Sequence, residues 1–202
     1  MPVIPIFPLE AVLLPGAPLP LHIFEPRYKE MIAECLEQHK HFGVVRAKEG
    51  SIAEIGCTAE ILDVIKRYDD GRMDIATAGR QRFEIVELVS GRSFMQAEVT
   101  LVDDQPAVVT QDEVRRAVEL HSQVLDLAGA EAEIDEEDLD DPQLSYRLAG
   151  ALPMDLDFKQ TLLITRSEEE RLSGLIQFYE TIIPTLIRVR KAREKAGGNG
   201  HV

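Results

Sequence analysis

The sequence predicts an α+β protein with a strand-rich N-terminal part and a helical C-terminal part. Up to about residue 102, short runs rich in Val, Ile, Phe and Thr alternate with breaks that contain glycine, which is typical of a β-meander. From about residue 110, apolar residues recur at the three-and-four spacing of a helix face. We therefore expect a β-rich domain over residues 1–105, a helical subdomain over 108–195 and a disordered Gly-rich tail over 196–202.

The N-terminal segment is expected to be extended as far as residue 24 and to be followed by a helix. Prolines recur through this segment, and each pushes the residue before it toward extended geometry. Glu25 stands at the predicted N-cap and Pro26 at the first helical position, where a missing N–H does no harm. The helix should end near His41. Its apolar face is predicted to contain Tyr28, Met31, Ile32, Cys35, Leu36 and His39.

The strands that follow are predicted over residues 42–47, 58–68, 72–78, 82–89 and 94–102. Asp70-Gly71 is a strong hairpin signal, because glycine accepts the positive φ that hairpin turns require. The apolar alternation changes phase between Ile85 and Val86, which indicates a bulge or a barrel corner there.

Polar residues mark the start of each predicted helix in the C-terminal part. Thr110 with Glu113 forms a capping box for a helix that ends at Gly129, and Ser167 with Glu170 forms another for a long helix. Pro184 should kink or restart that long helix. Two shorter helices are predicted between them, one capped by Asp141-Pro142 and one started by Asp155.

Composition limits the partners and the compartment. The chain has 202 residues, is 45% hydrophobic and carries a net charge of −14, so it can bury a core but lacks the cationic surplus that binds nucleic acid or anionic lipid. No apolar run reaches the roughly 20 residues that span a bilayer, and the N-terminal prolines are incompatible with a helical secretion signal. The two cysteines form no disulfide framework. We expect a soluble protein of the reducing cytoplasm, with no nucleic-acid or membrane partner.

Motifs for catalysis or for metal and cofactor binding are not found. His39 and His41 have no partners at ligand spacing, and His121 lies in a helix stripe without a second histidine four residues away. Gly91-Arg92-Ser93-Phe94 lacks the second glycine of a nucleophile elbow. The run 131–141 holds eight acidic residues in eleven but no calcium-loop pattern, so a solvated loop between helices is favoured.

Several stretches together resemble the N-terminal domain family of Lon proteases, over about residues 3 to 187. The resemblance is carried by Ile4-Pro5-Ile6-Phe7-Pro8-Leu9, Leu14-Pro15-Gly16, Leu19-Pro20-Leu21-His22-Ile23-Phe24-Glu25, Arg27-Tyr28, Gly56-Cys57-Thr58-Ala59-Glu60-Ile61, Gly79-Arg80-Gln81-Arg82-Phe83, Leu152-Pro153-Met154, Lys159-Gln160, Leu163 and Glu170-Arg171-Leu172.

The resemblance implies a PUA-like pseudo-barrel of strands followed by a helical bundle. It also implies the substrate-recognition part of Lon without its ATPase and peptidase, since the chain has no phosphate-binding loop and no residues left for those domains. The expected function is a non-catalytic polypeptide-binding module for unfolded or tagged segments. It would act as an adaptor or regulator of proteolysis beside a protease or chaperone. The alternative is a structural protein that forms a homo-oligomer through its helical half, and a small-ligand enzyme comes third.

Conspicuous residues within the resemblance have structural interpretations. Glu25 is expected to cap its helix, Tyr28 to pack inward and Arg27 to be exposed or paired. Arg82 is expected to form an ion pair inside the sheet edge rather than to anchor a ligand. The basic helix end from Arg188 to Lys195 is interpreted as a macrodipole interaction that also aids solubility, with a partner site as the alternative.

The polypeptide site is predicted on the long helix. Apolar residues cover about half of its circumference, which is wider than the stripe that one docking surface needs. One interpretation is that the helix is wedged between its bundle and the barrel, with all of these side chains in the core. The other is that Phe178 and Ile182 face a crevice toward the loop containing Leu13 and Leu14, and bind a hydrophobic segment or a second copy there.

Overall fold

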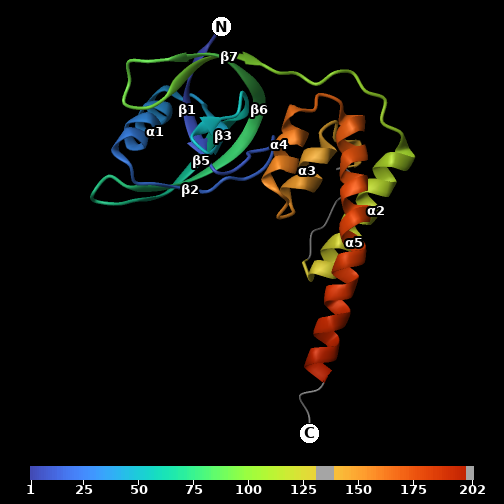
Figure 1. Cartoon of the computed structure of the whole chain (residues 1–202). Helices are drawn as coiled ribbons and strands as arrows, with labels where there is room; N and C mark the ends of the chain where they lie inside the picture. Colours follow the sequence, from blue (N-terminus) through green and yellow to red (C-terminus); the bar gives the residue numbers. More distant parts are fainter. Residues whose placement is uncertain (131–138, 199–202) are drawn as a thin grey trace. The chain divides into compact units, whose positions relative to one another are not determined.

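The computed structural model describes residues 1–130 and 139–198, which form two compact units (Figure 1). The strand unit holds Met1–Asp104 and Leu152–Ile164, and the helical unit holds Gln105–Ala151 and the chain from Thr165 onward. The segment 152–164, which its periodicity places in the helical subdomain, packs with the strands, because Asp157 pairs with Arg46 at 2.6 Å and Gln160 Nε2 donates to the carbonyl of Ile55 at 3.0 Å.

The strands of the first unit form a closed barrel (Figure 1). The elements are β1 (Val3–Leu9), β2 (Leu21–Ile23), α1 (Pro26–Gln38), β3 (Phe42–Lys48), β4 (Ser51–Ile52), β5 (Ile55–Arg67), β6 (Met73–Val89), β7 (Gln96–Leu101) and α4 (Leu156–Ile164). The sheet order is β1-β7-β6-β5-β3-β4, and β1 also pairs in parallel with β3, which closes the strands β1, β7, β6, β5 and β3 into a ring. The predicted α+β fold class is confirmed.

Side chains that point into the barrel form its core. Ile6, Val45, Phe83, Ala97 and Val99 are at most 1% exposed and lie in one hydrophobic cluster. They come from strands β1, β3, β6 and β7, so that distant parts of the sequence meet in the same interior.

Strand β6 corrects the prediction of two strands over 72–78 and 82–89. It runs unbroken through Gly79, which the sequence pattern marks as a break. A Cβ at Gly79 would lie 2.2 Å from the carbonyl oxygen of Leu14, so glycine is required by the close approach of another backbone and not by a turn. The predicted hairpin turn is confirmed, since Gly71 has a φ of 79° between β5 and β6. The predicted bulge is confirmed as well, since the β6–β7 register shifts between Ile85 and Glu87.

Helix α1 begins at Pro26 as predicted, but Glu25 caps it only by position. The Glu25 side chain makes no capping hydrogen bond and instead accepts one from Arg27 Nε at 2.9 Å. Arg27 is therefore the paired residue that was expected, and Tyr28 is buried at 8% exposure. The helix ends at Gln38, three residues before the predicted His41, because His39 takes up a left-handed conformation with a φ of 50°.

The helical unit consists of α2 (Gln111–Ala128), α3 (Leu144–Gly150) and α5 (Glu168–Gly198) among the described residues. The capping box of Thr110 and Glu113 is confirmed with both hydrogen bonds present. Helix α5 neither ends nor restarts at Pro184, and it continues through residues 196–198 of the predicted tail. Residues 199–202 and most of the acidic run lie outside the described residues. Among the described residues, no helix combines the length and the apolar composition that a membrane span requires.

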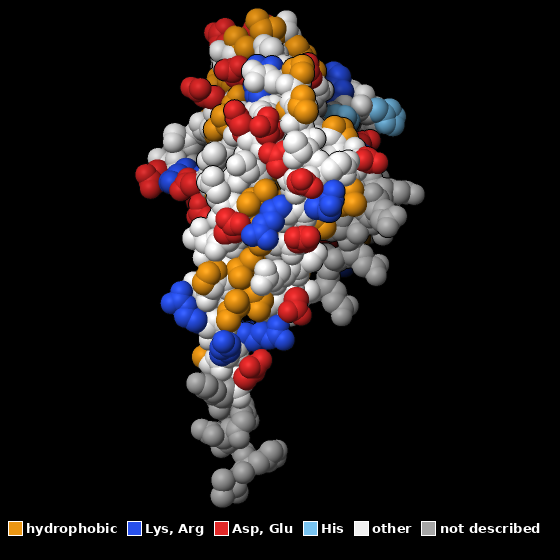
Figure 2. Space-filling view, turned by 90° about the vertical axis from the view of Figure 1, so that its right-hand side faces the viewer, with side chains coloured by type: hydrophobic (Ala, Val, Ile, Leu, Met, Phe, Trp, Pro, Cys, Tyr) orange, Lys and Arg blue, Asp and Glu red, His pale blue; other side chains and the backbone are white. Residues whose placement is uncertain are grey.

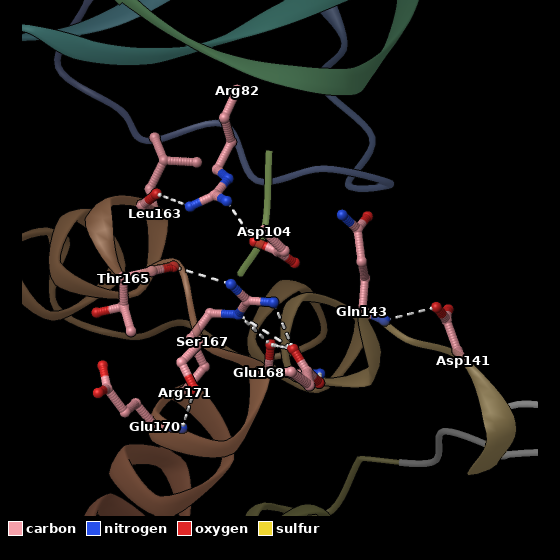
Figure 3. A network of polar contacts seen from close by, with 11 residues as sticks. Arg82, Asp104, Asp141, Gln143, Leu163, Thr165, Ser167, Glu168, Glu170 and Arg171 are labelled. Atoms are coloured by element: carbon pink, nitrogen blue, oxygen red, sulfur yellow. Dashed lines mark hydrogen bonds and ion pairs between the residues drawn. The ribbon is translucent and has the colours of Figure 1, made fainter. Parts of the chain in front are cut away.

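A buried polar network holds the start of α5 against α3 (Figure 3). Arg171 has no solvent exposure, and its guanidinium donates to Glu168 Oε2 at 2.6 Å and to the carbonyl of Thr165 at 2.8 Å. Ser145 Oγ donates to the same carboxylate at 2.6 Å. Burial raises the pKa of Glu168, against the opposing effect of these hydrogen bonds and of Arg171.

Candidate functional site

A groove in the strand unit lies between the end of β1, the whole of β2 and the start of α1. Its volume is about 230 Å³, and it is lined by residues 7–9, 21–25, 27 and 28. The lining belongs to the segment that carries the densest part of the family resemblance. Glu25, Arg27 and Tyr28, which were given structural roles from the sequence, are therefore also walls of this groove.

Prolines remove main-chain donors from the edge of the segment 18–22 that faces away from β6, beside the groove. Odd-numbered residues from 19 to 23 face β6, and Leu19 N donates to the carbonyl of Thr77 at 2.8 Å. The even-numbered residues Pro18, Pro20 and His22 consequently turn their main chain to the opposite edge, where two of the three have no N–H. This arrangement opposes strand addition, so a ligand in the groove meets side chains rather than a main-chain ladder.

Aromatic side chains form the outer rim of the groove. Phe24 is 59% exposed, and its ring stacks on His22 at a centroid distance of 6.0 Å. His22 lies edge-on to Tyr68 at 5.9 Å, and its Nδ1 is 2.5 Å from Asp74 Oδ1. Tyr68 donates to the other oxygen of Asp74 at 2.8 Å. Asp74 thus holds His22 and Tyr68, and Phe24 stacks on His22; we call these three side chains the aromatic rim.

Two β-bulges in β5 add further exposed aliphatic side chains to the strand unit. The β5–β6 register shifts between Ile61 and Asp63 and again between Val64 and Lys66, which leaves Leu62 and Ile65 as the extra residues. They are 55% and 63% exposed. Ile65 precedes Lys66 on β5. Lys66 lies opposite Asp74 on β6, and Asp74 in turn lies opposite His22 on β2. We call Leu62 and Ile65 the bulge residues.

The charged groups around the rim compensate one another. Arg27 pairs with Glu25 at 2.9 Å and Arg72 with Asp70 at 2.6 Å. The hydrogen bond from His22, together with that from Tyr68, lowers the pKa of Asp74, so this carboxylate is ionised at neutral pH and already bonded. A ligand therefore meets exposed apolar and aromatic surface with little net charge. Over residues 1–130 and 139–198, no three His, Cys, Asp or Glu side chains converge on a metal position.

The four residues predicted to bind a polypeptide are divided between the two units. Leu13 and Leu14 are buried in the strand unit at 3% and 1% exposure, so their side chains present almost no surface. Phe178 and Ile182 are half-buried on α5, beside the fully buried Leu175 and Tyr179. Binding at these four positions stays a prediction.

Sequence reasoning missed the aromatic rim and the bulge residues for different reasons. Phe24 belongs to a stretch that carries the family resemblance, but nothing in the sequence shows that its side chain is exposed. The bulges did leave a signal, since Ile61-Leu62 and Val64-Ile65 are adjacent apolar pairs that interrupt the alternation of a regular strand. Arg82, by contrast, follows its prediction: it is 2% exposed and bonds Asp104 and the carbonyl of Leu163 within the strand unit (Figure 3).

Comparison with known proteins gives consistent matches. The sequence model of the "ATP-dependent protease La (LON) substrate-binding domain" matches residues 3–180. The Lon protease of Buchnera aphidicola subsp. Baizongia pistaciae is 26% identical over 216 residues, which cover 96% of this chain and 27% of the relative. The Lon protease of Cytophaga hutchinsonii is 25% identical over 209 residues, which cover 96% of this chain and 26% of the relative. The chain thus spans about a quarter of the length of these relatives.

Solved structures agree with the sequence comparison. A Lon N-terminal domain protein from Xanthomonas campestris is 26% identical, with a TM-score of 0.71 over 88% of this chain and 98% of that one. The N-terminal domain of Lon protease from the Mycobacterium avium complex shares the fold, with 22% identity and a TM-score of 0.66 over 89% of this chain and 98% of that chain.

A strand barrel followed by a helical unit is the fold that this chain shares with these Lon N-terminal domains. The match over residues 3–180 then identifies the kind: the chain belongs to the family of Lon protease substrate-binding domains. The resemblance carried by the sequence motifs is confirmed.

Proposed function

We propose that this chain binds unfolded polypeptide segments through the groove and aromatic rim of its strand unit. The observation that carries the proposal is the exposure of Phe24 in the lining of a groove whose charged groups are already paired, together with the exposed Leu62 and Ile65 on β5 of the same unit. Apolar side chains of an unfolded segment gain from burial there, and no complementary charge is needed. The family relationship supports a polypeptide as the ligand.

The groove suits an anchor side chain more than a long strand. Its volume of about 230 Å³ is of the order of one large side chain, and proline guards the neighbouring strand edge. A client is therefore held by one large apolar residue in the groove, with further contacts over the rim. Such recognition tolerates many sequences, which suits an adaptor or regulator that presents clients to a protease or chaperone.

A reducing cytoplasm remains the proposed location. Cys35 and Cys57 are both free and buried. Burial raises the pKa of the Cys35 thiol to about 11 and that of Cys57 to about 12, so neither is a reactive thiolate at neutral pH.

The test is binding of a fluorescent, permanently unfolded model protein to the whole chain. Phe24→Ser and Ile65→Ser should each weaken binding about tenfold, while the melting temperature stays within about 2 °C of the parent, because both side chains are exposed. Val108→Ser is the matched control, since Val108 is 83% exposed and lies outside the groove. Equal affinity for all three variants and the parent would exclude this surface as the client site.

A further inference from the structure

The groove of the strand unit contains a polar group without a hydrogen-bond partner, the hydroxyl of Tyr28. Tyr28 lines the groove and is 8% exposed. Its ring is held by Phe7, at a centroid distance of 4.1 Å, and by the guanidinium of Arg27, 4.5 Å from the ring centroid. No side chain or main-chain group within residues 1–130 and 139–194 bonds the hydroxyl, which retains some accessible surface. A buried tyrosine hydroxyl usually has a partner, so this one is available to a ligand.

The Tyr28 hydroxyl keeps its proton at neutral pH. Burial raises the pKa of Tyr28, while Arg27 acts in the opposite direction and Glu25 in the same direction. The protonated phenol can donate one hydrogen bond and accept another. The influence of both charged side chains also places them close to the phenol.

Glu25 supplies a second unused position at this end of the groove. Nε and Nη2 of Arg27 both approach the same carboxylate oxygen, Glu25 Oε2, at 2.9 Å. The other oxygen, Oε1, accepts no hydrogen bond from the side chains that the structure describes. Glu25 is the N-cap of α1 and Tyr28 lies three residues later, the spacing at which side chains meet in a capping box. The groove therefore has a polar end with an acceptor and a hydroxyl, and Arg27 compensates its charge.

Exposed apolar surface alone does not define the ligand. Figure 2 shows hydrophobic side chains exposed over the helical unit as well, among Lys, Arg, Asp and Glu side chains. The groove of the strand unit instead combines its polar end with an apolar lining formed by Phe7, Pro8, Leu9, Leu21 and Ile23. This combination is typical of sites in which apolar contacts give affinity and a few polar groups choose the ligand.

We propose that the groove selects tyrosine as the anchor residue of a client segment, and that Tyr28 determines this specificity. The selection depends on the client binding proposed above. The ring of the client tyrosine lies against the apolar lining, while its hydroxyl donates to Glu25 Oε1 and accepts from the Tyr28 hydroxyl. The volume of about 230 Å³ is of the order of one such side chain.

Other large anchors leave a polar group of the groove unpaired. Phenylalanine or leucine fills the apolar part but bonds neither Glu25 nor the Tyr28 hydroxyl. The indole of tryptophan donates but does not accept. An acidic anchor is repelled by Glu25, and a basic anchor is repelled by Arg27. Because water still reaches the groove and can bond the unpaired groups, the preference for tyrosine over phenylalanine is about fivefold and not the far larger factor of a closed site.

The experiment uses two versions of the fluorescent unfolded model protein, with tyrosine at every aromatic position in one and phenylalanine in the other. The whole chain should bind the tyrosine version about fivefold more tightly, although the phenylalanine version is more hydrophobic. Tyr28→Phe should remove this preference by weakening binding of the tyrosine version alone. Its melting temperature should stay within about 2 °C of the parent, because the lost hydroxyl has no bond within the described fold.

Tyr68→Phe is the matched control, since it removes a hydroxyl that bonds Asp74 and lies outside the groove lining. A preference that Tyr28→Phe abolishes and Tyr68→Phe preserves supports the proposal. Equal or tighter binding of the phenylalanine version overturns it, and so does a preference that survives in Tyr28→Phe. If Phe24→Ser still weakens binding of both versions in those cases, the client site stands and only the selection of tyrosine is lost. Failure of both versions to bind the parent chain overturns the client site as well.

Discussion

The two units of the chain differ in what they bury. In the strand unit the core is apolar, and Arg82 is the one buried side chain there that carries a charge among the residues described. The helical unit buries His121, Glu168 and Arg171, which are all ionisable. The comparison teaches that the barrel depends mainly on shape, whereas the helical unit depends on polar groups that must remain paired and in the right protonation state.

The largest effect is expected from breaking the buried ion pair of the helical unit. Arg171→Met leaves the Glu168 carboxylate buried without its cation, and should lower the free energy of unfolding by about 3–5 kcal/mol. The matched control is Arg116→Met, because Arg116 pairs with Glu180 at 2.8 Å in the same unit but both side chains are about half exposed. That control should cost no more than about 1 kcal/mol.

Hydrogen exchange followed by mass spectrometry distinguishes the two units in this test. Protection should fall in α3 and the first turns of α5 and persist in β3 and β6. If Arg171→Met and Arg116→Met destabilise the chain equally, the buried network has no special weight and the contrast between the units disappears.

The strand unit should instead respond to steric change. Gly79→Ala places a Cβ where only 2.2 Å separates it from the carbonyl oxygen of Leu14, and neither backbone can move without disturbing the sheet. We expect a loss of about 3 kcal/mol. Gly174→Ala is the control, since a Cβ at Gly174 meets nothing within 4 Å. A melting temperature unchanged by Gly79→Ala would show that β6 and the segment around Leu14 are not in close contact.

Acid should weaken the helical unit through His121. Burial lowers the pKa of His121 to about 4 from the usual 6.5, so the fold favours the neutral ring, which lies 3.0 Å from the hydroxyl of Tyr179. This contribution is complete above pH 6.5 and is lost as the pH falls from 6.5 toward 4, because only the unfolded chain gains the proton readily. Between pH 7 and pH 5 we expect a loss of about 2 kcal/mol.

The measurement is urea unfolding at several pH values, compared with His121→Gln. The variant should be less stable at pH 7 and should lose the part of the pH dependence that lies between pH 7 and pH 5. A parent whose stability is constant over that interval would contradict a neutral, buried His121.

The order and type of the helices and strands could be predicted from the sequence better than the tertiary contacts and the burial of their side chains. Capping boxes and hairpin signals are local, so Thr110 with Glu113 and Asp70-Gly71 could be recognised from neighbouring residues alone. Gly79 was misread because its cause is a backbone 65 residues away, near Leu14. The buried Leu14, like the exposed Phe24, depends on which segments lie across the barrel, and no local pattern reports that.

The smallest expected effect separates two kinds of glycine within the strand unit. Gly71 has a φ of 79°, and a Cβ there would meet nothing closer than the end of the Lys29 side chain at 3.9 Å. Gly71→Val is therefore strained by its backbone conformation and not by a collision, and should cost about 1–2 kcal/mol. Gly71→Asn should cost less than Gly71→Val, because asparagine tolerates the left-handed region. Thermal unfolding of both variants tests this order, and equal losses would mean that crowding rather than φ governs the turn, as it does at Gly79.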